Sequence, residues 1–160
     1  MSIELIHLLF PYGNTKLARF KFRIMSLKEK HAEIVAELEP FEEPQERFQY
    51  IIDCAKSAPS LPESLRRDEF LVEGCTSQLW MICDFADGVC RFRVDADAVI
   101  AKGIALLICN YFDGAAPAEI VADDADFLAS VGIDQHLSPN RRNGLANLVA
   151  KIHAFAKNCR

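Results

Sequence analysis

The chain has 160 residues and a formal net charge of −5 at pH 7, from 18 Lys and Arg against 23 Asp and Glu. This length favours a single domain whose core needs neither a metal nor disulfides. The acidic balance argues against a nucleic acid partner, no apolar run approaches a membrane span and no secretory signal peptide is visible, so we expect a cytoplasmic protein with reduced cysteines and no membrane partner.

Residues 1–25 differ in pattern from the rest of the chain. An apolar stretch over residues 3–10 precedes four basic residues between positions 16 and 23, with no acid between Glu4 and Glu29. We expect an N-terminal extension, 1–25, before a domain that spans 26–160. The sequence leaves three roles open for the extension: an organelle-targeting segment, a solvated basic arm, or a region upstream of a true translation start at Met25.

Two helices are expected next. Ser26 and Glu29 have the spacing of a capping box at the start of a helix that ends at Pro40. Pro44 lies near the first turn of a second helix. Apolar residues repeat along this second helix at a spacing that predicts a face packed on the core, namely Phe48, Ile51, Ile52 and Ala55.

Three short strands are expected in the middle of the chain, over residues 70–72, 79–86 and 89–94. The Asp87-Gly88 pair is a strong hairpin signal, and it places Cys90, Phe92 and Val94 on one face of the last strand. Together these segments predict a small three-stranded antiparallel sheet. With the helices on either side of it in the sequence, the fold class is α+β.

The apolar run 98–112 predicts a central buried helix, with Asp95 or Asp97 as its cap. Gly103 is unfavourable inside a helix, which indicates close packing against another element. We expect Lys102 to be solvated, with contact to a cysteine as the alternative.

A short helix is expected from Pro117 to Val121, followed by Asp123, Asp124 and Asp126 as caps of the next turn. Ser138 and Pro139 then have the pattern of a cap and first residue of a terminal helix. Its first turn carries Arg141 and Arg142, although the helix dipole favours acids at that end. These arginines are expected to meet a carboxylate or to bring positive potential towards a thiolate.

The loop between the first two strands holds the strongest candidate for chemistry. Gly74 precedes Cys75, and a glycine there allows the backbone to present the thiol at a loop tip. The alternative is that Cys75 is a small buried hydrophobe, the common fate of a free cysteine. The other five cysteines form no Cys-x-x-Cys pair and no zinc-ligand spacing, so we expect no metal site. Cys83 and Cys90 are expected to pack on the sheet.

Taken in order, four segments resemble the SufE family, the sulfur-acceptor partners of cysteine desulfurases in iron–sulfur cluster assembly. The matching segments are residues 47–52, 72–80, 99–104 and 137–145. The resemblance covers residues 36 to 155 and departs from the family at Thr76, Leu79 and Ala96. It implies a SufE/IscU-like fold, with a small antiparallel sheet packed against several helices.

The resemblance also implies a function. Cys75 would accept persulfide sulfur from a desulfurase that uses pyridoxal phosphate (PLP), stimulate that enzyme and pass the sulfur on to a recipient such as an iron–sulfur scaffold. The chain itself would bind no cofactor and would be a sulfur-transfer accessory, not the desulfurase. Loop residues Gly74, Ser77, Gln78 and Trp80 would support the thiol. Arg141, Arg142 and Lys102 would stabilise the thiolate or dock the partner.

Two other functions are kept as alternatives. One is an adaptor that regulates a desulfurase by binding alone. The other is a cysteine-dependent acyl-transfer enzyme, which needs a histidine base and an orienting acid. The candidate bases are His7, His31, His136 and His153, and none lies in a local signature with Cys75. The sequence leaves open which desulfurase and which acceptor are used, the oligomeric state, and whether Cys75 is buried at rest.

Overall fold

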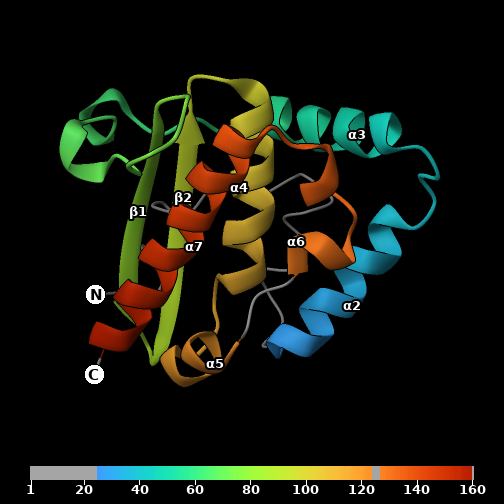
Figure 1. The fold of residues 1–160 in the computed structure, drawn as a ribbon. Helices are drawn as coiled ribbons and strands as arrows, with labels where there is room; N and C mark the ends of the chain where they lie inside the picture. The colour runs from blue at the N-terminus through green and yellow to red at the C-terminus, as the bar shows by residue number, and fades with distance from the viewer. Residues whose placement is uncertain (1–24, 124–126, 160) are drawn as a thin grey trace.

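The computed structural model describes residues 25–123 and 127–159. The predictions about an extension over 1–25 and about Asp124 and Asp126 therefore lie almost wholly outside the described residues. Figure 1 shows an antiparallel hairpin on one side of the molecule, with helices α4 (Val99–Phe112) and α7 (Pro139–Asn158) beside it. Helices α2 (Leu27–Leu38) and α3 (Pro44–Ser57) lie on the other side of α4. The mixed α+β class is confirmed.

The hairpin pairs β1 (Leu79–Ala86) with β2 (Val89–Ala96) in antiparallel register, from Leu79 opposite Ala96 to Ala86 opposite Val89. Its turn is the predicted Asp87-Gly88 pair, with φ of 55° and 79°. Two positive φ angles match the twist of the strands that the turn joins, so the loop fixes the register. The buried face of β2 carries the predicted Cys90, Phe92 and Val94, which are at most 2% exposed.

The prediction of a third strand over residues 70–72 is wrong, because within the described residues the sheet has two strands. Asp68–Phe70 forms a short 3₁₀ helix, η3, and Leu71 makes a single bridge to Trp80. The Val72 N–H donates to the Leu79 carbonyl at 2.8 Å, and the chain then turns at Gly74. The 3₁₀ helix before Leu71 and the turn after Val72 leave room for a single bridge, but not for a ladder of hydrogen bonds between strands.

Helix α4 is the central buried helix that its apolar run predicts, and it packs against α3 and β2. A Cβ atom at Gly103 would lie 2.6 Å from Ile51 Cγ2 and 2.9 Å from the Ile51 carbonyl oxygen. The absent side chain therefore lets the backbones of α3 and α4 approach, as predicted. Both faces of α4 are covered, which explains why nearly its whole length is apolar.

The remaining helices begin where the caps predict. Ser26 and Glu29 form both hydrogen bonds of the capping box at the start of α2, and Pro44 is the first residue of α3. The Ser138 side chain accepts a hydrogen bond from the Arg141 N–H at the start of α7. The shorter elements are η2 (Glu63–Leu65), α5 (Pro117–Ala122), α6 (Phe127–Ser130) and η4 (Asp134–His136).

Asp95 and Lys102 form a buried ion pair, which corrects two predictions. Helix α4 begins without a side-chain cap, so neither Asp95 nor Asp97 caps it. Asp95 is 1% exposed, and its carboxylate lies 3.1 Å from Lys102 Nζ and 2.6 Å from an Arg66 guanidinium nitrogen. Lys102 is therefore buried, not solvated, because the burial of this carboxylate requires a cation beside it.

Candidate functional site

The Cys75 thiol lies in a loop that joins the bridge at Leu71 to strand β1. Gly74 takes a φ of +76°, in the left-handed region that favours glycine, and so turns the chain immediately before Cys75. Cys75 itself is half-buried and packs at the margin of the hydrophobic core. Cys75 thus lies in a loop, as one interpretation of the sequence predicts, and is also partly packed, as the alternative predicts.

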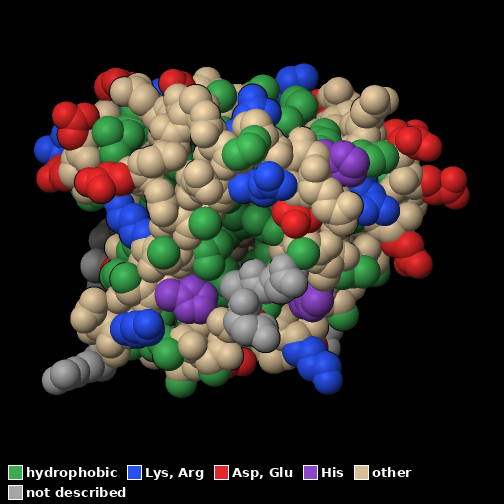
Figure 2. All heavy atoms as spheres, viewed as in Figure 1, with side chains coloured by type: hydrophobic (Ala, Val, Ile, Leu, Met, Phe, Trp, Pro, Cys, Tyr) green, Lys and Arg blue, Asp and Glu red, His purple; other side chains and the backbone are tan. Residues whose placement is uncertain are grey.

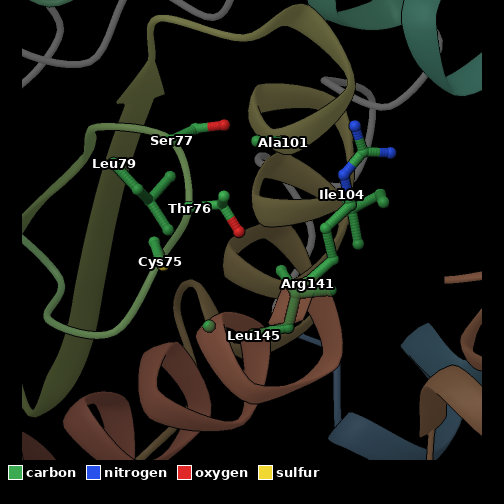
Figure 3. A pocket seen from close by; sticks show the side chains of 9 residues that line it. Cys75, Thr76, Ser77, Leu79, Ala101, Ile104, Arg141 and Leu145 are labelled. Atoms are coloured by element: carbon green, nitrogen blue, oxygen red, sulfur yellow. The ribbon is translucent and has the colours of Figure 1, made fainter. Parts of the chain in front are cut away.

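A small cavity of about 30 Å³ lies beside Cys75 (Figure 3). It is lined by the loop, the start of strand β1, helix α4 and the first turns of helix α7, and it is partly open to solvent. Its lining residues are Cys75, Thr76, Ser77, Leu79, Ala101, Ile104, Arg141, Gly144 and Leu145. Most of these walls are apolar, and the volume exceeds the space that one water molecule needs. The cavity is therefore large enough for one additional sulfur atom on Cys75.

Gly144 of α7 is in direct contact with the cysteine. A Cβ atom at position 144 would lie 2.8 Å from Cys75 Sγ and 3.0 Å from Cys75 Cα. Any side chain there would displace the loop, so glycine is what allows the thiol to rest against the helix. The segment 137–145 was recognised in the sequence, but Gly144 was not identified as a site residue.

Two further side chains of α7 bind the loop backbone. Asn147 Nδ2 donates to the Glu73 carbonyl at 2.9 Å, and Lys151 Nζ donates to the Leu71 carbonyl at 2.9 Å. Residues 144, 147 and 151 follow the spacing that places side chains on one face of a helix. In the sequence, the only sign of Asn147 and Lys151 is that they share a helix face with Gly144. They were not predicted as site residues because polar residues on a helix are usually exposed to solvent.

Burial raises the pKa of the Cys75 thiol above its ordinary value. The cause is that the apolar walls disfavour the charged thiolate. The shift favours the protonated form of the thiol in this position. Contact with water or with a positive charge would favour the thiolate, which is the nucleophilic form.

The three predicted cations do not lie together at the sulfur. Arg141 lines the cavity, yet Figure 3 shows its guanidinium nitrogens on the far side of the cavity from Cys75. Arg142 is exposed and is not among the lining residues. Lys102 is held by Asp95, the Ala58 carbonyl and Ser60. Its predicted role at the thiolate gains no support from this position.

Charge on the visible face is unevenly distributed. Figure 2 shows most acidic side chains of this face towards its left and right edges, while Lys and Arg side chains are scattered over it, one of them at the centre beside an acidic side chain. Arg141 and Arg142 are exposed at the start of α7. Their charges are therefore available to a partner that approaches the loop.

The predicted supporting residues take different positions. Ser77 lines the cavity. Gln78 is exposed, and its carbonyl accepts a hydrogen bond from the Asp97 N–H at 3.1 Å. Trp80 is 7% exposed in β1, with the Arg66 guanidinium carbon 5.6 Å from the centre of its ring. Ser77 thus belongs to the cavity, whereas Gln78 and Trp80 fix the end of the loop to the sheet.

The other described cysteines lie in or next to regular elements. The sulfurs of Cys90 and Cys159 are 4.0 Å apart, and Cys109 is 2% exposed inside α4. Burial raises the pKa of Cys83 to about 11 and that of Cys90 to about 12. All six cysteines lie in the described residues, and none of them forms a disulfide. In residues 25–123 and 127–159 no three His, Cys, Asp or Glu side chains gather as metal ligands, and no helix there is long and apolar enough to cross a membrane.

Comparisons with known proteins agree on one family. Residues 32–156 match the family model of SufE, described as an Fe-S metabolism associated domain. An uncharacterised SufE-like protein of Rhizobium meliloti is 32% identical over 130 residues, which span 78% of this chain and 93% of that protein. SufE-like protein 1 of Arabidopsis thaliana, named as chloroplastic/mitochondrial, is 32% identical over 127 residues, 79% of this chain and 34% of that protein.

A solved structure supports the fold. The solution structure of a hypothetical protein from Thermus thermophilus superposes with a TM-score of 0.65 at 18% identity. The match covers 80% of this chain and 93% of that one. At this identity the likeness concerns the fold alone, and it shows that the hairpin and helices form a known arrangement.

Proposed function

The chain belongs to the SufE family, whose members act as sulfur acceptors in iron–sulfur metabolism, and from this we propose that Cys75 is its sulfur-accepting residue. In this proposal the donor is a cysteine desulfurase whose PLP cofactor generates a persulfide on its own cysteine. The chain stimulates that enzyme and carries the sulfur to a recipient such as an iron–sulfur scaffold. The reaction takes place in the cytoplasm, where thiols stay reduced.

The proposed transfer is a thiol exchange that leaves the overall oxidation state unchanged. The Cys75 thiol gives its proton to water or to a base, and its thiolate attacks the outer sulfur of the donor persulfide. A new sulfur–sulfur bond forms on Cys75 while the bond inside the donor persulfide breaks. The donor cysteine leaves as a thiolate, and Cys75 holds the outer sulfur as a persulfide.

The observation that carries the proposal is the cavity beside the sulfur. Its apolar walls, which include Leu79, Ile104 and Leu145, would shelter a persulfide from water and from other thiols. A thiol that reached the persulfide would attack it and release the sulfur. None of the other five cysteines is among the residues that line this cavity. This isolation is suited to a carrier and would be unsuited to a dithiol oxidoreductase.

The test is sulfur transfer from labelled cysteine in the presence of the desulfurase. We expect Cys75→Ser to fold normally and to lose all label on the chain, whereas Cys83→Ser, which alters a half-buried thiol in β1, retains it. Mass spectrometry of the labelled peptide locates the added sulfur. If Cys75→Ser still accepts label, the assignment is wrong.

The same variant separates a carrier from an adaptor. An adaptor acts by binding alone, so Cys75→Ser would keep full stimulation of the desulfurase, whereas a carrier would lose it. The acyl-transfer alternative requires a histidine near the thiol, and no histidine is among the residues that line the cavity in the described part of the chain. His31 contacts Ser130, while His136 and His153 lie edge-on to Phe48 and Phe112.

A further inference from the structure

The loop that carries Cys75 is held differently on its two sides. After the cysteine, the chain is fixed by the Gln78 carbonyl, which accepts from the Asp97 N–H, and then by the ladder of β1. Before the cysteine, the Val72 N–H donates to Leu79, and the carbonyls of Leu71 and Glu73 are held by α7 side chains. Residues 74–77 form no backbone hydrogen bond among the described residues.

We propose that Asn147 and Lys151 are positioning residues that hold Cys75 in its cavity, and that release of their two hydrogen bonds brings the thiol into reach of its reaction partners. Asn147 holds the carbonyl two residues before the cysteine, and Lys151 holds the one four residues before it. The inference rests on the proposed function for its role in sulfur transfer, while the positioning itself concerns only the loop and α7.

The packing around Gly74 supports this role. A Cβ atom at Gly74 would lie 2.3 Å from Asn147 Nδ2, so the amide occupies the space that any other residue would fill. The Asn147 amide therefore lies against the residue that turns the chain towards Cys75. Gly144, one helical turn earlier on the same face, contacts the sulfur itself.

The hydrogen bonds from Asn147 and Lys151 are weak enough to break and form again reversibly. Asn147 is exposed and Lys151 is half-buried, so water competes for both donors. Such hydrogen bonds each contribute a modest net stabilisation. Both acceptors are backbone carbonyls, so a partner that offers its own donors to Leu71 and Glu73 could replace the α7 side chains without any change in the loop sequence.

The experiment measures how fast iodoacetamide alkylates each cysteine of the full chain, read by peptide mass spectrometry. The variants are Asn147→Ala, Lys151→Met and the double substitution. Lys157→Met and Asn158→Ala are matched controls, since Lys157 is exposed on α7 and the Asn158 amide bonds to Ala154 of its own helix. We expect Cys75 to react about fivefold faster in each single variant and faster still in the double variant.

A pH profile provides a second readout. Burial raises the pKa of Cys75, so release of the loop should lower it and move the alkylation profile of the double variant to lower pH. The rate at Cys109, which is buried in α4, reports global loosening and should stay unchanged.

Three results would overturn the inference: no change at Cys75 in the double variant, a parallel rise at Cys109, or an equal rise in the matched controls. Failure here is separate from failure of the proposed function. The first is read from alkylation without any desulfurase, and the second from sulfur acceptance by Cys75→Ser.

Discussion

Two contacts in this fold combine the same two residue types, a helix glycine and a lysine, but we expect them to have different effects. In the framework contact, Gly103 of α4 meets Ile51 of α3, and the adjacent Lys102 binds the buried carboxylate of Asp95. In the loop contact, Gly144 of α7 meets Cys75, and Lys151 on the same helix face binds a backbone carbonyl. Each contact combines a helix glycine, which allows close approach, with a nearby lysine: Lys102 also binds the Ala58 carbonyl at the end of α3, and Lys151 binds the Leu71 carbonyl at the start of the loop.

The difference lies in what stands opposite the glycine. Helix α3 carries its own backbone hydrogen bonds and a buried face, so it has no alternative position. Residues 74–77 of the Cys75 loop form no backbone hydrogen bond among the described residues and are at most half-buried, and the segment before them is held by side-chain donors that water can replace. The framework contact is therefore expected to govern stability, and the loop contact to govern the reactivity of one thiol.

The largest expected effect on stability is at the ion pair of the framework contact. Asp95→Asn leaves the Lys102 ammonium, 7% exposed at the residue level, without its carboxylate. Removing one partner of a buried pair costs about 3–5 kcal/mol of unfolding free energy. Urea unfolding measures this loss, and Asp97→Asn, which alters an exposed acid two residues away, is the matched control with little expected change.

The pH dependence of the stability lost in Asp95→Asn tests whether the loss comes from the ionised Asp95 carboxylate. Burial acts to raise the pKa of Asp95, but hydrogen bonds from the Leu61 N–H, Arg66 and Lys102 outweigh it and leave the pKa below its ordinary value. A lowered folded-state pKa contributes stability that is present near neutral pH and lost as the pH falls through that pKa. The difference between wild type and Asp95→Asn should therefore shrink in acid. A constant difference would assign the loss to packing.

A smaller loss is expected from Gly103→Ala. The new Cβ would lie 2.6 Å from Ile51 Cγ2 and 2.9 Å from a backbone oxygen, so two helices must separate. Overpacking of this kind costs about 1–3 kcal/mol, against a gain of about 1 kcal/mol from the better helix propensity of alanine. Thermal unfolding measures the net decrease, and the alkylation rate of Cys75 should not change. A faster Cys75 would show that the two contacts are coupled.

The sequence predicted the parts of this comparison that local chemistry determines. The Asp87-Gly88 turn and the Ser26 and Ser138 caps were predicted because each follows from backbone geometry within a few residues. The close packing of Gly103 was predicted because glycine is unfavourable inside a helix, although its distant partner Ile51 was not. Cys75 is the candidate thiol both from its loop position after Gly74 and from the family resemblance.

The parts that the sequence missed depend on distant partners. Residues 70–72 have the apolar character of a strand, but the Leu71 carbonyl is bound by Lys151, 80 positions away. Lys102 looked solvated because nothing nearby in the sequence reveals that Asp95 is buried beside it. Asn147 and Lys151 are ordinary polar residues of a helix until the loop is placed against them.

The smallest expected effect on stability, and the sharpest test of the comparison, is Gly144→Ala. Its Cβ would lie 2.8 Å from Cys75 Sγ, so the loop must move outwards, whereas α7 gains about 1 kcal/mol of helix propensity. We expect the unfolding free energy to stay within about 1 kcal/mol of wild type, because the displaced loop loses few buried contacts. Cys75 should nevertheless alkylate faster, with Cys109 unchanged. If this substitution instead costs as much stability as Gly103→Ala and leaves Cys75 slow, the loop is as firmly packed as a core helix.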